Sequence, residues 1–195
     1  MSLRILVSLL SFVSLATACN SLPKRPGESV TTTGKASTLE QKSPIEVALA
    51  PIVDASGNTA LPAGELRRAF QGALVKRHYS PIALDLVDSK VVKAAYHPGA
   101  LEEQAVLVIE VQRWDTHLWD TRDVIEVTIR ARMLDPENPS GELWSGVLEK
   151  RFDFGEIHDQ FTTESALTRY ACEKISNELL EVMPARQATP GHAKP

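Results

Sequence analysis

The chain has 195 residues, of which 43% are apolar and 24% charged, the composition of an ordinary globular protein. This length suits one domain with short tails, and it is enough to bury a core without disulfides or structural metals. The formal net charge of -4, with no basic run, excludes nucleic acid as a partner, because binding to phosphates depends on clustered lysine and arginine.

Residues 1–18 have the layout of a secretory signal. Arg4 is followed by an apolar run over residues 5–15 and then by three small residues. The apolar run is shorter than the roughly 20 residues that a membrane-spanning helix needs. We therefore expect export from the cytoplasm and removal of this segment.

Cys19 follows the small residues directly. Residues 15–19 resemble the lipobox of bacterial lipoproteins, with Ala16 where that family most often has leucine. The resemblance implies that Cys19 becomes an acylated N-terminus; the alternative is an ordinary signal cleaved after Ala18 that leaves Cys19 free. Under the sorting rule of enteric lipoproteins, the absence of aspartate at position 20 implies an outer-membrane protein that faces the periplasm.

The mature chain is expected to have three parts. Residues 19–44 are rich in serine, threonine, proline and glycine and have almost no large apolar residue, so they are predicted to form a flexible tether that begins at the lipidated cysteine. Residues 45–183 carry the periodic apolar patterns of a globular periplasmic domain. Residues 184–195 are predicted to be a disordered tail, with Pro184 ending the last helix.

Five segments within the domain have the patterns of β-strands. Residues 122–134 alternate most clearly, with Ile125, Val127 and Ile129 on one side and charged residues on the other, which is typical of a half-buried antiparallel strand. The last three strands follow one another without a helix, so they are expected to form an antiparallel meander. The predicted strands are 45–53, 79–84, 105–114, 122–134 and 142–152.

Three segments have the spacing of amphipathic helices. The first begins at Pro62, the second carries Val91 and Val92, and the third covers about residues 163–182. Cys172 lies in the third helix, where we expect it to be buried. The order β-α-β-α-β-β-β-α predicts an α+β fold, a mixed sheet with a three-stranded antiparallel meander and helices packed on one face.

Three segments resemble a known family. They are residues 79–84 after the first helix, residues 105–114, and the hairpin that runs from residues 131–135 to residues 141–146. They are similar to envelope lipoproteins related to the TolB amino-terminal domain, which include the curli-secretion CsgG type and penicillin-binding-protein activators. In this hairpin Asp135 and Gly141 bracket the turn and Trp144 is expected in the core. The resemblance implies a fold and carries no chemistry. Two prolines lengthen the turn, and no amphipathic hairpin of the kind that a secretion pore needs is evident.

The candidate contact site is the loop around Trp114, His117 and Trp119. Tryptophan is enriched in the anchors of protein interfaces, so these residues are predicted to bind a partner; the alternative is that both tryptophans fold back onto the core. The side chains of Asp115, His117 and Asp120 carry oxygen and nitrogen atoms that can bind metals, but their spacing matches no metal-binding motif. These residues are therefore predicted to form a polar hairpin loop. We therefore expect no metal and no cofactor.

No nucleophile elbow, phosphate-binding loop or dinucleotide-binding glycine pattern occurs in the sequence, and no enzymatic activity is expected. The expected function is that of a membrane-anchored, non-catalytic accessory to an envelope machine for transport, secretion or cell-wall synthesis. Its partners are the membrane, reached through the lipid, and an envelope protein. The alternatives are an oligomeric subunit of an outer-membrane secretion structure, which requires a homo-oligomer, and a periplasmic hydrolase.

Overall fold

A computed structural model describes residues 29–32, 36–92 and 98–187 of the chain. The predicted signal, Cys19 and the first part of the tether lie outside the described residues. The strands are β1 (Ser29–Thr32), β2 (Glu46–Leu49), β3 (Val53–Asp54), β4 (Ser80–Pro81), β5 (Ala105–Leu118), β6 (Val124–Asp135) and β7 (Asn138–Asp153). The helices are α1 (Ala36–Lys42), α2 (Ala63–Lys76), α3 (Leu84–Val92), α4 (Trp119–Arg122), the 3₁₀ helix η1 (Gly155–Gln160) and α5 (Glu164–Glu181).

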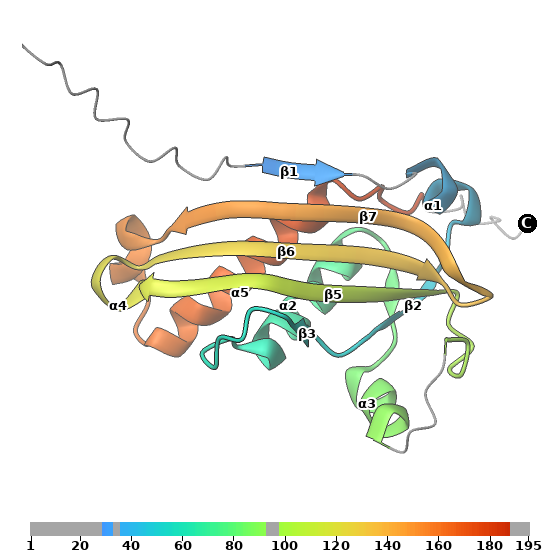
Figure 1. The fold of residues 1–195 in the computed structure, drawn as a ribbon, viewed down its shortest axis with the longest axis horizontal. Helices are drawn as coiled ribbons and strands as arrows, with labels where there is room; N and C mark the ends of the chain where they lie inside the picture. Colours follow the sequence, from blue (N-terminus) through green and yellow to red (C-terminus); the bar gives the residue numbers. More distant parts are fainter. Residues whose placement is uncertain (1–28, 33–35, 93–97, 188–195) are drawn as a thin grey trace, which may run out of the picture.

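The strands form one open, mixed sheet in the order β1-β7-β6-β5-β2-β4, with β3 paired to β5 (Figure 1). β5, β6 and β7 are the antiparallel meander, while β2 pairs in parallel with both β4 and β5. This architecture confirms the predicted α+β class and the predicted meander. In β6 the alternation is also confirmed: Ile125, Val127 and Ile129 are buried, and the polar residues between them, Glu126 and Thr128, are half-buried on the opposite face.

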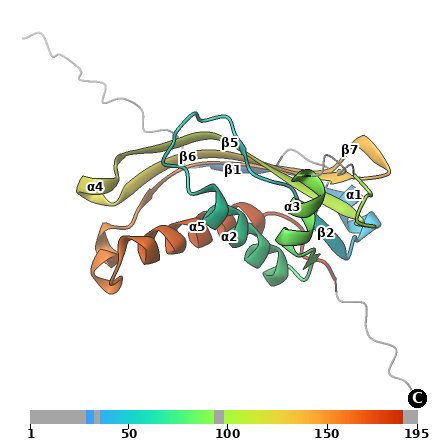
Figure 2. The same ribbon diagram turned by 90° about the horizontal axis from the view of Figure 1, so that it is seen from below.

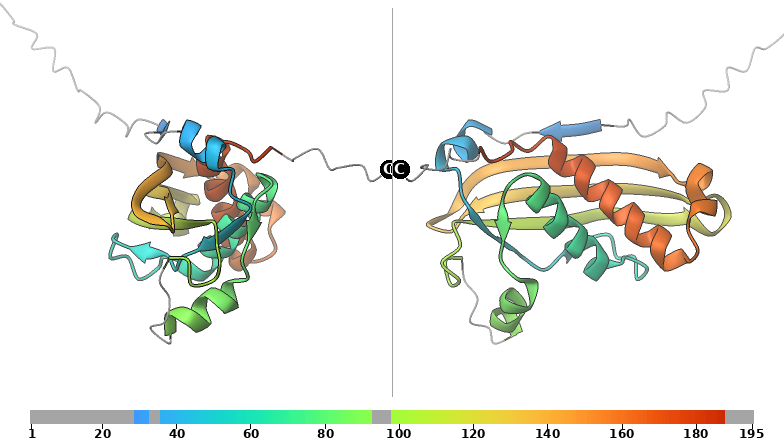
Figure 3. Two further views of the ribbon diagram at one scale, coloured as in Figure 1. Left: turned by 90° about the vertical axis from the view of Figure 1, so that its right-hand side faces the viewer. Right: turned by 180° about the vertical axis from the view of Figure 1, so that it is seen from behind.

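The two long helices, α2 and α5, lie side by side on one face of the sheet, as predicted (Figures 2 and 3). Phe70 and Leu74 of α2 and Ile175 and Leu179 of α5 are fully buried in the core between these helices and the strands. α5 begins where the sequence indicated, since the Thr163 hydroxyl accepts a hydrogen bond from the backbone N–H of Ala166 at 3.2 Å.

The short helix α3 packs apart from this layer. Its buried residue Val87 contacts Ala48 and Val106, whose neighbours Val47 and Leu107 belong to the main core. Because successive side chains of a strand point to opposite faces, α3 covers the other face of the sheet at its parallel end. The prediction that helices pack on one face therefore holds for α2 and α5 and not for α3.

The predicted tether is shorter than expected. β1 pairs antiparallel with β7, and α1 buries Leu39, which is 1% exposed. The Lys42 ammonium of α1 pairs with the Asp135 carboxylate in the β6–β7 hairpin. Edge pairing uses backbone hydrogen bonds, so it needs no apolar pattern, and one leucine is enough to dock a short helix.

The domain also extends beyond residue 183. The Tyr79 hydroxyl donates a hydrogen bond to the carbonyl oxygen of Pro184 at 2.8 Å, and the N–H of Arg186 donates to the carbonyl oxygen of Arg77 at 3.0 Å. The start of the predicted tail therefore belongs to the folded domain, and residues 188–195 lie outside the described residues. None of the helices in the described part of the chain is long and apolar enough to cross a bilayer.

Candidate functional site

The structure separates the three predicted contact residues. Trp114 of β5 is buried, with 4% of its surface exposed, and its carbonyl oxygen accepts a hydrogen bond from the Asn58 side-chain amide at 2.6 Å. Trp119 begins α4 and is partly buried against the core. His117 is 61% exposed. Trp114 is therefore not an exposed anchor and folds back onto the core, the alternative that the sequence left open, because a β-bulge between Val111 and Arg113 shifts the alternation of β5 and turns the ring inward.

Trp119 lies between two hollows at the end of the sheet where β5 turns into β6. One hollow, of about 350 Å³, is lined by α4, η1 and the start of α5. The other, of about 250 Å³, reaches Trp114 and Ile125 of the sheet and Pro62 ahead of α2. Trp119, Asp120 and Glu164 line both hollows. The buried Trp114 thus contributes to the site by lining the second hollow.

Aromatic side chains support Trp119 from below. Its ring meets that of Phe154 edge-on, and Phe154 in turn stacks on Phe152 with centroids 5.9 Å apart. Phe154 also makes an edge contact with Tyr170, whose ring lies 5.1 Å from that of Phe161. Such contacts hold the aromatic rings in defined orientations. Trp119 is therefore held in a defined orientation by a packed cluster of aromatic rings.

The charged groups around Trp119 are mostly acidic. Asp123 ends α4 with a left-handed φ of 53°, and its carboxylate oxygen Oδ1 lies within hydrogen-bond distance of Nδ1 of the His158 ring, at 2.8 Å. Asp120 and Glu164 are exposed, and within the described parts of the chain their side chains have no hydrogen bond or ion pair. An indole flanked by free carboxylates suits a cationic side chain, which is attracted by both the ring face and the negative charges.

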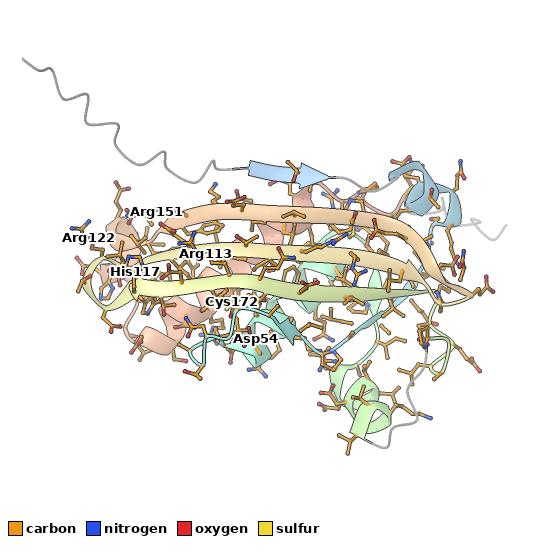
Figure 4. The ribbon with its side chains drawn as sticks, in the orientation of Figure 1. Asp54, Arg113, His117, Arg122, Arg151 and Cys172 are labelled. Atoms are coloured by element: carbon orange, nitrogen blue, oxygen red, sulfur yellow. The ribbon has the colours of Figure 1, made fainter. Side chains whose placement is uncertain are left out.

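Beside this site, the open face of the sheet carries a chain of ion pairs. The Arg113 guanidinium contacts Glu126 at 2.5 Å and Asp115 at 3.0 Å, and Arg151 approaches the same Glu126 at 3.9 Å. Figure 4 shows Arg113, Arg151 and His117 at this end of the strands. Their mutual pairing leaves this face polar and internally neutralised, in contrast to the free carboxylates beside Trp119.

His117 belongs to this outer face. Its ring nitrogen Nδ1 lies 2.6 Å from the Asp115 carboxylate, and its backbone N–H donates to the same carboxylate at 3.1 Å. These hydrogen bonds, the ring contact foremost, lower the pKa of Asp115 to about 2. His117 lines neither hollow, so the structure does not bring it together with Trp119. In the described ranges, no group of three or more His, Cys, Asp or Glu side chains is arranged to hold a metal ion.

The sequence analysis missed several residues of this site, namely Phe154, His158, Phe161 and Glu164. They come from η1 and its flanks and from the start of α5, and lie about 35 to 45 residues after Trp119 in the chain. No local motif marks them. The run of aromatic residues between positions 152 and 170 was the one available signal.

No protein-family model and no curated protein matches this chain. Among solved structures, the PelC dodecamer from Paraburkholderia phytofirmans is similar, with a TM-score of 0.53, 16% sequence identity, and coverage of 83% of this chain and 100% of the PelC chain. The lipoprotein GNA1162 from Neisseria meningitidis has a TM-score of 0.48 and 19% identity, covering 71% of this chain and 99% of that chain. At this level of identity, the comparison with PelC shows that the two chains share a fold.

Proposed function

We propose that this chain is a lipid-anchored protein of the bacterial envelope that binds a partner protein and helps to assemble an envelope machine, without catalysing a reaction. The observation that carries the binding role is the position of Trp119 between two hollows, on a packed aromatic base and next to carboxylates with no partner in the described structure. Tryptophans in such surroundings are typical anchors of protein interfaces.

The chemistry of the site favours a partner segment with a cationic side chain. Asp120 and Glu164 supply negative charge to both hollows beside Trp119, and Ile125 and Ala171 supply apolar surface in the second hollow. A lysine or arginine with its aliphatic stem can use both features, because the stem packs on apolar surface while the charged head pairs with carboxylates.

Cross-linking in the native envelope tests this binding role. Trp119→Ala is expected to lose the cross-linked partner, and Asp120→Asn combined with Glu164→Gln is expected to weaken the cross-link. His117→Ala is the matched control, because His117 is exposed at the same end of the sheet but lines neither hollow. If all variants capture the same partners with the yield of the wild type, the site does not lie at Trp119.

The lipid anchor at Cys19 is the second part of the proposal, and it is supported by the sequence of residues 1–19. Two or three acyl chains give stable attachment, because each buried methylene contributes about 0.8 kcal/mol. Mass spectrometry of the mature protein is expected to show a chain that begins at an acylated Cys19. The proposed outer-membrane location predicts that Asn20→Asp moves the protein to the inner-membrane fraction of a host that follows the enteric sorting rule.

A homo-oligomer is the second candidate arrangement. It is favoured by the shared fold with PelC, which is described as a dodecamer. Light scattering of the detergent-solubilised protein distinguishes the two: a single large species supports a ring-shaped assembly subunit, and a monomer or dimer supports an accessory that acts alone. We also propose that the chain is related to envelope lipoproteins of the TolB and CsgG type, which its sequence resembles.

A further inference from the structure

The place where the chain enters the sheet restricts how the domain sits on its membrane. β1 is the first described segment, and it pairs with β7 so that Ser29 lies opposite Glu149 and Thr32 opposite Gly146. Because the pairing is antiparallel, the start of β1 points toward the end of β7 at Asp153. Figure 1 shows the start of β1 on the side of the sheet where α4 lies.

We propose that the end of the domain formed by α4 and η1, which carries Trp119, faces the phospholipid surface to which the chain is anchored. This inference rests on the proposed lipid anchor at Cys19. It assigns the Trp119 site to the membrane-proximal side of the molecule, where a partner embedded in or lying on the same membrane can reach it.

The length of the preceding segment supports this orientation. Nine residues lie between Cys19 and Ser29, and the ten residue-to-residue steps of a fully extended chain span at most about 36 Å. The end of β7 lies only four residues beyond Glu149, or about 13 Å along the strand. The opposite end of the sheet lies eleven residues back at Asn138, or about 37 Å away. The extended segment is more than twice as long as the distance to the end of β7 at Asp153, but it only equals the distance to Asn138 at the other end. The α4 end is therefore the end that the anchor can bring to the membrane with length to spare.

The outer edge of β7 offers the chain a path toward the α4 end. In the described structure β1 covers residues 146–149 of that edge, and no strand pairs there with residues 150–153.

The surface at this end fits a headgroup region. Trp119, Ile157 and Phe161 are partly exposed there while packing on the core. Amphipathic aromatic rings such as indole are favoured at the boundary between lipid and water.

A pair of probes tests the orientation in the full, lipidated protein. Thr121→Cys places a fluorophore on the exposed surface of α4, and Glu137→Cys places one at the opposite end, where the side chain is 86% exposed. The native Cys172 is fully buried and stays unlabelled. The proteins are inserted in vesicles of phosphatidylethanolamine and phosphatidylglycerol that carry a nitroxide on some headgroups.

The expected result is a larger loss of fluorescence at position 121 than at position 137. Insertion of about twenty glycine and serine residues between Cys19 and Ser29 should remove the difference, because a chain of that length no longer restrains the domain. Equal loss at both positions in the uninserted protein, or a larger loss at 137, overturns the orientation. Mass spectrometry of the same samples separates the two proposals: an acylated Cys19 with equal losses refutes only the orientation, and an unmodified Cys19 refutes the anchor and the orientation with it.

Discussion

The ring of Trp119 meets the ring of Phe154 edge-on, with centroids 6.0 Å apart and an angle of 71° between the planes. Trp119 opens the short helix α4, and Phe154 follows the end of β7 and precedes η1. The contact therefore joins the two segments that build the candidate site. It holds the partly buried indole at the surface of the domain, against the buried ring of Phe154.

This contact predicts how Trp119→Ala affects stability. Because the ring is only partly buried, its removal is expected to lower the free energy of unfolding by about 1–2 kcal/mol, well below the 3–5 kcal/mol typical of a fully buried tryptophan. Urea denaturation measures the change. Trp119→Phe keeps an aromatic edge and should lose less. A loss as large as that of a core tryptophan would mean that the residue mainly supports the fold, and the cross-linking result would then need to be corrected for unfolding.

Gly146 gives a prediction about the β6–β7 hairpin. A Cβ atom at this position would lie 2.8 Å from Cζ2 of Trp144 and 3.3 Å from Leu179 of α5. Gly146→Ala is therefore expected to destabilise the domain by about 1–3 kcal/mol, because the fully buried Trp144 ring has no room to move. Gly72→Ala in α2 is the matched control: its Cβ atom meets nothing within 4 Å, and alanine should stabilise the helix by about 0.5–1 kcal/mol. Equal effects in urea denaturation would contradict this account.

Asp115 predicts a pH dependence. The hydrogen bonds from His117, chiefly that of the ring, lower the pKa of Asp115 from 3.8 to about 2. A carboxyl group whose pKa is lower in the folded state stabilises the fold above its unfolded pKa, and this stabilisation is lost as the pH falls from about 4 through 2. Carboxyl-carbon NMR titration should show Asp115 titrating near pH 2 in the wild type and at a higher pH in His117→Ala.

Unfolding measurements check the same pair of residues. The difference in stability between wild type and His117→Ala should be present at pH 5 and should shrink toward pH 2. Asp120→Asn is the control, since the Asp120 side chain has no partner among the described residues. Its effect on the free energy of unfolding should not shrink between pH 5 and pH 2. A difference that stays constant across this range would show that His117 acts through packing.

Cys172 is predicted to be chemically inert in the folded protein. The thiol is fully buried in α5, and burial raises its pKa to about 12. Because the thiolate is the reactive form, alkylation at pH 8 should be undetectable in the folded protein and rapid in urea. Mass spectrometry after timed quenching measures both rates. Fast alkylation without denaturant would show that α5 opens locally at this position, and it would also invalidate the labelling scheme for the orientation test.

Much of the fold could be read from local patterns. The alternation in residues 122–134 predicted β6, and the spacing after Pro62 and Thr163 predicted α2 and α5 within a few residues. These elements are long, and their side chains repeat with the period of the element, so the pattern reports directly which face is buried. In α5 the expected burial of Cys172 is confirmed, and the buried face also includes the polar residue Ser176, while Tyr170 is 37% exposed.

Short and edge elements were not visible in the same way. β1 is held by backbone hydrogen bonds to β7, and every sequence has the groups that make them. α1 is docked by Leu39 and by the pairing of Lys42 with Asp135, ninety-three residues away in the chain. The side of the sheet that α3 covers depends on the crossover from β4 to β5, and the pattern of α3 contains no information about that connection.

For the candidate site, too, the sequence predicted the local features and the tertiary structure decided the rest. The amino-acid order placed Trp114, His117 and Trp119 within six residues and identified a tryptophan-rich turn. A β-bulge between Val111 and Arg113 turned Trp114 inward and left His117 on the outer face, and the start of α4 put Trp119 between the hollows. Glu164 and Phe161 joined Trp119 because α5 packs across the sheet and brings its first turn to the β5–β6 corner. Distances between side chains of separate elements are set by packing, and local sequence does not encode them.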